Sequence, residues 1–236
     1  MDFLMDVFDW FADADQWSGE AGIPNRVYEH VRLSALSIAV AGALAIPLAV
    51  VLGHRRGAAD LSIPVVNIAR AIPSFAIIAI AFPFSLRLGL GFGFWPTFLA
   101  LVFLAVPPIF ANAYTGVASA SRDIVEAGRG MGMRASELML NVELPVAAPL
   151  IVTGLRIAAV QVVATATLGA LVGWGGLGRY IIDGFSVQDN VRVFAGAVLV
   201  AGLAIVTDVA FGLLQRFVDP ERRVAAARAV TATAKT

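Results

Sequence analysis

Long runs of apolar residues constrain the fold of this chain more than any other feature of its sequence. A helix that crosses a bilayer needs about 20 mainly apolar residues. Two runs, 33–52 and 90–121, contain no charged side chain, and three more, 61–86, 144–174 and 193–215, contain one each. We therefore predict an all-α integral membrane protein with about five transmembrane helices, near residues 32–53, 61–86, 95–116, 148–172 and 193–216.

The composition agrees with a membrane protein and disfavours several kinds of function. Hydrophobic residues make up 59% of the 236 residues and charged residues 14%, whereas soluble domains carry roughly 25% charged residues. The formal net charge is zero, so no nucleic-acid partner is expected. The chain has no cysteine and only two histidines, on different segments. We therefore expect no metal site, no bound cofactor and no membrane enzyme based on cysteine or histidine.

An acidic amphipathic segment, residues 1–30, precedes the first predicted span. Apolar residues recur in it at roughly helical spacing between five aspartates, Asp2, Asp6, Asp9, Asp13 and Asp15. A secretory signal begins with basic residues, so this segment does not resemble one. An amphipathic helix on the membrane surface and a weakly ordered acidic tail both fit the pattern.

Basic residues near the ends of the spans predict the orientation of the chain. Cytoplasmic loops of membrane proteins carry an excess of lysine and arginine. If the N-terminus is outside, ten basic residues face the cytoplasm and five face the outside. We therefore predict an N-out, C-in topology, with a transmembrane domain at residues 31–218, a cytoplasmic loop at 119–146 and a cytoplasmic tail at 219–236.

The predicted cytoplasmic loop starts with a helix that is weak by itself. Asp123 and Glu126 have the spacing of a capping box at a helix start. Three glycines follow at positions 128, 130 and 132, and each costs a helix about 1 kcal/mol relative to alanine. Such a helix is better explained by close contact with another surface than by its own stability.

A second short helix is expected in the same loop, from Ser136. Leu138, Met139 and Val142 would lie on its apolar face. We expect this helix to end at Leu144 and Pro145, because proline disfavours the helical conformation of the residue before it. The loop as a whole is therefore predicted to be a helix-loop-helix that docks on a partner.

The loop also carries a long, fixed spacing of particular residues, namely Glu126, Ala127, Gly128, Gly132, Val142, Leu144 and Pro145. This spacing resembles the EAA motif of the permease subunits of ABC importers. Glycine replaces the second alanine of the motif, and valine replaces the usual isoleucine. In that family the segment is a coupling helix that sits in a groove of the ATPase subunit, so the resemblance implies ATPase contacts for these residues. An incidental loop between spans is the alternative.

Further short sequences extend the resemblance over residues 30–215. In chain order they are 71–75 (AIPSF), 112–116 (NAYTG), 142–145 (VELP), 154–156 (GLR) and 173–178 (GWGGLG). Their order is similar to that in the permeases of osmoprotectant importers, which carry glycine betaine, choline, carnitine or proline-like solutes. Permeases for methionine and other amino acids share several of these sequences, so such a cargo remains the alternative.

The resemblance implies a fold, a location and a set of partners. The fold is that of a type I ABC importer permease in the bacterial cytoplasmic membrane, in contact with lipid. The implied partners are two copies of an ATP-binding subunit, a second permease subunit that is identical or a sister protein, and an extracytoplasmic solute-binding protein. ATP and Mg would be used by the ATP-binding subunit.

The chain lacks a P-loop of its own. That motif needs a lysine directly after its glycines, and the single lysine is Lys235. Residues 173–178 match G-x-G-x-x-G, but they follow an apolar helix instead of a strand, so we expect a tight turn that lines an external gate. We predict a transport subunit and not an enzyme. An ion-coupled secondary transporter is a weaker alternative, because internal repeats and acidic residues near the midplane are not evident.

Small and polar residues in and between the spans are candidates for the translocation path and its gate. They are Pro73, Ser74, Asn112, Gln161, Thr165, Gly173, Gly175, Gly176 and Gly178. Gln161, Thr165 and Gly169 share one helix face, where tight helix packing is the alternative explanation. A mildly polar, uncharged path would suit a solute without net charge, such as betaine.

Three charged residues lie inside predicted spans, Arg70, Arg156 and Asp208. Charges that face lipid are costly, so each is expected to point inward or to be paired. Arg70 is expected to form an ion pair or to serve the path, and Arg156 to snorkel or pair near the inner edge. Asp208 is expected to pair with either arginine or to cap the inner end of the last helix.

Overall fold

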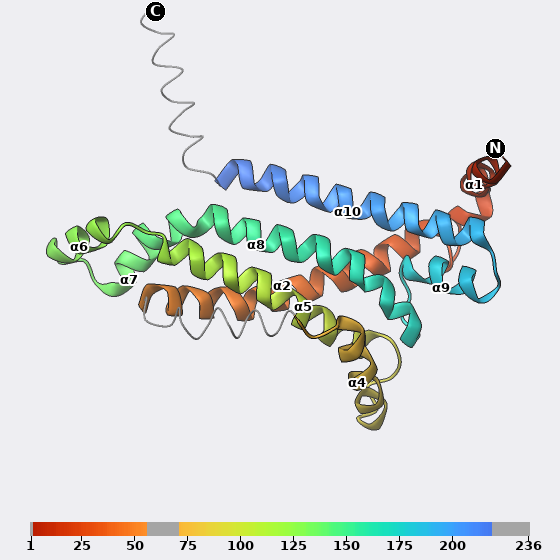
Figure 1. The fold of residues 1–236 in the computed structure, drawn as a ribbon, viewed down its shortest axis with the longest axis horizontal. Helices are drawn as coiled ribbons and strands as arrows, with labels where there is room; N and C mark the ends of the chain where they lie inside the picture. The colour runs from red at the N-terminus through yellow and green to blue at the C-terminus, as the bar shows by residue number, and fades with distance from the viewer. Residues whose placement is uncertain (1, 56–70, 219–236) are drawn as a thin grey trace, which may run out of the picture.

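The computed structural model describes residues 2–55 and 71–218, and every regular element within these ranges is a helix (Figure 1). The elements, in chain order, are α1 (Asp2–Ala12), the 3₁₀ helix η1 (Ala14–Trp17), α2 (Ile23–Arg55), α4 (Ser74–Arg87), α5 (Phe94–Ala118), α6 (Arg122–Gly130), α7 (Ala135–Leu138), the π-helical turn η2 (Met139–Glu143), α8 (Leu144–Thr165), the 3₁₀ helix η3 (Ala166–Val172), α9 (Gly178–Ser186) and α10 (Asn190–Val218). The predicted all-α fold is confirmed.

Four helical stretches in the described ranges are long and apolar enough to cross a membrane, namely α2, α5, the continuous stretch Ala135–Val172, and α10. A fifth span was predicted at residues 61–86. Residues 61–70, with Arg70, lie outside the described residues, and the described part contains α4, which has 14 residues. A helix of that length extends about 21 Å, which is shorter than a hydrocarbon core about 30 Å thick.

α2 begins earlier than the span predicted near 32–53, because its first turns pack against a distant part of the chain. Ile23, Leu177 and Tyr180 form a buried cluster. The hydroxyl of Tyr180 also donates a hydrogen bond of 2.6 Å to the carbonyl of Ala21, directly before the helix. The predicted boundary at residue 30 therefore falls inside α2.

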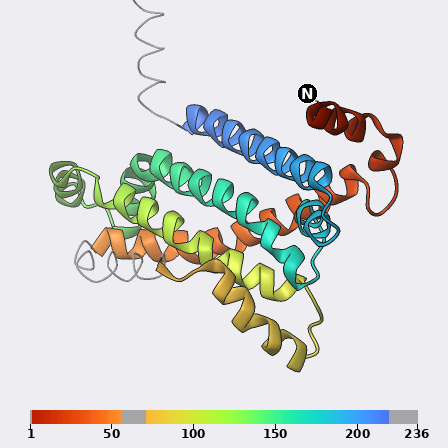
Figure 2. The same cartoon turned by 45° about the vertical axis from the view of Figure 1, so that its right-hand side comes forward.

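α1 is an amphipathic helix that lies across the long direction of the spanning helices (Figures 1 and 2). Its Val7 is buried. The ring of Phe3 is 5.5 Å from the ring of Phe194 in α10, and the ring of Trp10 is 5.4 Å from that of Tyr180. Of the two predicted alternatives for the N-terminal segment, the structure has the helix. Its contact with a membrane surface stays a prediction.

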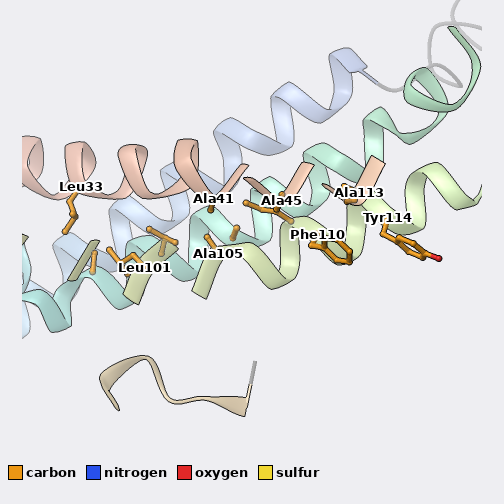
Figure 3. Close-up of a cluster of buried hydrophobic side chains, with 13 residues drawn as sticks. Leu33, Ala41, Ala45, Leu101, Ala105, Phe110, Ala113 and Tyr114 are labelled. Atoms are coloured by element: carbon orange, nitrogen blue, oxygen red, sulfur yellow. The ribbon is translucent and has the colours of Figure 1, made fainter. Parts of the chain in front are cut away.

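The core of the bundle consists largely of small side chains. α5 packs against α2, α4 and α8, and α2 also packs against α8. Alanines fill the buried contact between α2, α5 and α8 (Figure 3), including Ala41, Ala45, Ala49, Ala105, Ala113 and Ala158. In lipid, helices associate by close van der Waals packing, which small residues permit. The alanine faces therefore explain why these three helices lie together.

An ion pair connects α10 to α8. The Nε and Nη2 atoms of Arg156 donate hydrogen bonds to the two carboxylate oxygens of Asp208, each at 2.7 Å. Of the arrangements that the sequence allowed, Asp208 therefore pairs with Arg156. A bidentate pair of this kind satisfies both charges within two helices that are apolar enough to span a membrane, where an unpaired charge that faced lipid would be costly.

We expect Asp208→Ala to lower the Tm of the purified protein in detergent by a few degrees, because it leaves the Arg156 guanidinium without its counter-ion. The measurement is thermal unfolding followed by intrinsic fluorescence. The double variant Arg156→Ala/Asp208→Ala should lose less than the two single variants together. Strictly additive losses would show that the pair contributes nothing to stability.

Candidate functional site

The loop segment, which we define as residues 119–146, projects beyond the ends of the spanning helices (Figure 1). It contains α6, α7 and the π turn η2. Val125 and Leu138 are buried in it and pack with Ala120, Met133 and Val142. The segment is therefore a helix-loop-helix with a small core of its own, as the apolar spacing predicted.

Two glycines of the loop segment are required by its internal geometry. A Cβ atom at position 128 would lie 2.6 Å from Cδ2 of Leu138 and 3.2 Å from the sulfur of Met133. Gly132 has a φ of +87°, a left-handed conformation that other residues rarely adopt. We predicted that the glycines leave room for a partner. At Gly128 this chain fills that room, whereas Gly130 faces open space.

The surface of the loop segment combines apolar and charged side chains. Ile124 is 57% exposed and Met131 is 78% exposed. Glu126 and Ala127, the first two residues of the predicted motif, are exposed as well. Large exposed apolar side chains beside charged ones, outside the spans, are compatible with a contact surface for another protein.

The predicted capping box at the start of the first loop helix is wrong. α6 begins after Ser121 without a side-chain cap, so Asp123 and Glu126 do not cap it. A carboxylate serves this purpose one helix later, where Glu137 accepts a hydrogen bond of 2.7 Å from the backbone N–H of Arg134. The spacing of acidic residues thus identified the correct motif type at the wrong helix.

The prediction that Leu144 and Pro145 end a helix is also wrong. They begin α8, and η2 joins α7 to α8 without a break. Proline is tolerated in the first turn of a helix, where its missing N–H is not needed. The loop segment therefore passes directly into a spanning helix.

The π turn places one charged side chain in the protein interior. Glu143 is 1% exposed, and its Oε2 atom is 2.6 Å from Nδ1 of His54 at the end of α2. Since a carboxylate can only accept, Nδ1–H of His54 is the donor in this pair. The contact joins the loop segment to α2.

A cavity of about 230 Å³ between α4, α5 and α8 brings two predicted path residues together. Ser74 and Gln161 line it beside apolar residues that include Phe103, Pro107 and Ile157. The described residues that line the cavity carry no charge. A hydroxyl and an amide in apolar surroundings fit the mildly polar path that the sequence predicted.

The other predicted path residues of the spans lie outside this cavity. Asn112 donates a hydrogen bond of 2.8 Å to the carbonyl of Pro108, and its Cβ packs against Gly154. Thr165 directly precedes η3, and Pro73 directly precedes α4. For Asn112, tight packing between α5 and α8 is thus the explanation that the contacts support.

Residues 173–178 form a tight turn between η3 and α9 that two side chains of α2 hold. The backbone N–H of Gly176 donates to Oε2 of Glu29 at 2.7 Å, and that of Leu177 donates to Nδ1 of His30 at 3.3 Å. His30 is 1% exposed, and its Nε2 lies 2.8 Å from the carbonyl of Val163. This hydrogen-bond pattern fixes the neutral tautomer with the proton on Nε2.

The glycines of this turn permit those contacts. Gly173 and Gly176 have φ values of +87° and +76°. A Cβ at Gly175 would collide with the Glu29 carboxylate, and one at Gly178 would collide with the backbone of Thr167. The predicted tight turn is therefore present, and its part in an external gate stays a prediction.

Tyr180 lies in α9, directly after this turn, and burial raises the pKa of its phenol. The phenol therefore stays protonated at neutral pH and keeps its hydrogen bond to the carbonyl of Ala21. The same ring contacts Trp10 of α1. Tyr180 thus connects the turn to the N-terminal segment.

Four polar residues that no sequence pattern indicated make contacts at the two ends of α2, namely Glu29, His30, His54 and Glu143. Their partners are 89 to 147 positions away in the chain. A local pattern cannot indicate such contacts. The one available signal was that an ionisable residue inside or next to an apolar run needs a partner.

Comparisons with known proteins identify relatives over most of the chain. Residues 45–220 match the family model described as "Binding-protein-dependent transport system inner membrane component". The choline transport system permease protein OpuBB of Bacillus subtilis is 37% identical over 83% of this chain and 88% of its own length. The glycine betaine/carnitine/choline transport system permease protein OpuCB of the same organism is 36% identical over 82% of this chain and 87% of its own length.

A solved structure shares the fold at lower identity. It is a chain of the MetNI methionine ABC transporter in inward-facing conformations, with a TM-score of 0.73 and 22% identity. The match covers 84% of this chain and 96% of that one. The predicted likeness to ABC importer permeases is thereby confirmed at the level of the fold.

We expect Gly128→Val to disorder the loop segment, because the added methyl groups would overlap the side chain of Leu138. Overpacking of this kind destabilises a packed site by about 1–3 kcal/mol. Hydrogen exchange of the residues around Val125 and Leu138 measures this effect. Gly130→Val is the matched control, since that position faces open space. Equal exchange in both variants would contradict the packing described for Gly128.

Proposed function

The chain belongs to the family of binding-protein-dependent transport system inner membrane components, and from this membership we propose that it is the permease subunit of an ATP-driven osmoprotectant importer. Its solutes would be glycine betaine, choline, carnitine or proline-like compounds. The relatives named above are choline and glycine betaine/carnitine/choline permeases, and this supports the cargo. The family and the four apolar helices place the chain in the bacterial inner membrane.

The observation that carries the proposal is the loop segment. It has its own core, lies beyond the spans and exposes Ile124 and Met131. An ATP-driven transport subunit without a P-loop would receive its energy from a partner through such a surface. Glu126 and Ala127 would lie at the contact with the ATP-binding subunit, while Gly128, Gly132 and Val142 would keep the segment in shape.

The proposed complex contains two permease subunits, two ATP-binding subunits and a solute-binding protein. The N-terminus lies outside, so the loop segment faces the cytoplasm. ATP with Mg, bound by the partner subunits, draws the two loop segments together. Because η2 joins the loop segment to α8 without a break, this movement turns the spans from an inward-open to an outward-open arrangement. The binding protein then delivers its solute from the outside.

The cavity beside Ser74 and Gln161 supports a solute without net charge. Glycine betaine pairs a quaternary ammonium with a carboxylate, and the described residues that line the cavity, which carry no charge, impose no charge mismatch on it. The Ser74 hydroxyl and the Gln161 amide can donate hydrogen bonds to the carboxylate. Tight recognition of a quaternary ammonium uses several aromatic rings, and Phe103 is one ring. Selection therefore belongs to the binding protein, and passage to the permease.

Uptake of labelled glycine betaine and choline tests the proposal. The chain is supplied with its ATP-binding subunit and binding protein in a host without osmolyte importers, at high osmolarity. We expect ATP-dependent uptake that unlabelled carnitine competes. Failure with both solutes, together with uptake of methionine, would keep the permease role and exclude the osmoprotectant cargo. Uptake that survives ATP depletion and collapses with the ion gradient would indicate a secondary transporter.

Replacement of Gly132 by a bulky residue should abolish transport and leave membrane insertion intact. Gly132→Trp forces a side chain into a left-handed conformation at the turn between α6 and α7. Gly132→Asn is the matched variant, because asparagine tolerates this conformation better than other residues, and it should keep a larger share of uptake. Normal uptake by Gly132→Trp would rule out the docking role of the loop segment.

A further inference from the structure

The junction between the loop segment and α8 contains a buried carboxylate that the proposed function does not use. Glu143 lies in the π turn η2, is 1% exposed, and accepts a hydrogen bond of 2.6 Å from His54. π turns inside helices are rare and are frequent at functional sites. In this turn the carboxylate points toward the last turn of α2.

The end of α2 is itself held tightly against the bundle. A Cβ at Gly53, beside His54, would lie 2.9 Å from Cβ of Val117 in α5. Val50, Val117 and Ala147 form a buried cluster that joins α2, α5 and α8 at the same level. A force that moves His54 is therefore passed on to α5 and α8 as well as to α2.

We propose that the bond between Glu143 and His54 is the link that makes α2 follow the loop segment during transport, with both residues as positioning residues for energy coupling. The inference rests on the proposed function. If the Glu143 carboxylate moved away from His54, it would become a buried charge without a hydrogen-bond partner, which is costly. A shift of η2 should therefore move the end of α2 as well. The apolar cluster beside the pair then moves with it.

Stability alone is a poor reason for such a pair. A buried carboxylate with a hydrogen-bond partner is often no more stabilising than apolar residues of the same size, because its charge must leave water. The pair instead restrains the relative position of the two side chains, because a short hydrogen bond holds its donor and acceptor atoms to within a few tenths of an ångström. Leu144 and Met139 on either side of Glu143 pack into the apolar cluster and lack this restraint.

The test measures solute imported per ATP hydrolysed. The full complex, with its ATP-binding subunit and binding protein, is reconstituted in liposomes and supplied with a mixture of labelled glycine betaine and choline. We expect His54→Ala and Glu143→Ala each to lower this ratio by between about two- and thirtyfold. ATP hydrolysis and the amount of assembled complex should be retained. The double variant should be no worse than the worse single variant, since all three lose the same bond.

Two further variants separate positioning from general damage. His54→Asn places an amide donor near the position of Nδ1 and should recover part of the ratio. Arg55→Gln, at the exposed neighbouring position, removes a charge without touching the pair and should leave the ratio unchanged.

An unchanged ratio in His54→Ala would overturn the link. So would a parallel loss of uptake, ATP hydrolysis and assembled complex, because that pattern indicates only a structural role. The wild-type complex is measured first. If it shows no ATP-driven uptake, the proposed function itself fails, and this failure is distinct from a failure of the link.

Discussion

Close contact between the alanine faces of α2, α5 and α8 is the interaction on which the rest of this structure depends. Lipid offers no hydrophobic gain for helix association, so the helices stay together by van der Waals contact over surfaces that small residues keep flat. Glycines mark the tightest contacts, since a Cβ at Gly154 would lie 2.9 Å from Cβ of Asn112. A bundle packed this closely transmits displacement instead of absorbing it.

Polar contacts then fix both ends of this bundle, and α2 provides side chains for each. At one end Glu29 and His30 hold the turn of residues 173–178. At the other end His54 holds Glu143 of the loop segment. His30 and Glu143 are each 1% exposed, and in such surroundings a hydrogen bond is strong and an unpaired polar group is costly. One continuous helix thus connects the proposed gate to the proposed ATPase contact.

The elements that sequence predicts well are those that depend on local properties. The four described spans follow from hydropathy, and the helix-loop-helix of the loop segment follows from the spacing of its apolar residues. Pro145 shows the limit of such local prediction. A proline can follow the end of one helix or lie in the first turn of the next, and the sequence does not distinguish the two. Glu29, His30, His54 and Glu143 were beyond prediction for another reason. Each meets a partner through packing between helices that are distant in sequence, and no local pattern records that packing.

The cavity beside α4 indicates where a second permease subunit belongs. α10 and α4 lie on opposite sides of the bundle (Figures 1 and 2). Both sides expose apolar side chains, such as Ile205 and Val206 on α10 and Ile80 on α4, so apolar exposure alone does not distinguish them. The side of α4 holds the cavity with Ser74 and Gln161. Because polar groups that face lipid are costly, the proposed second subunit belongs over that cavity, where the two chains together would enclose the path.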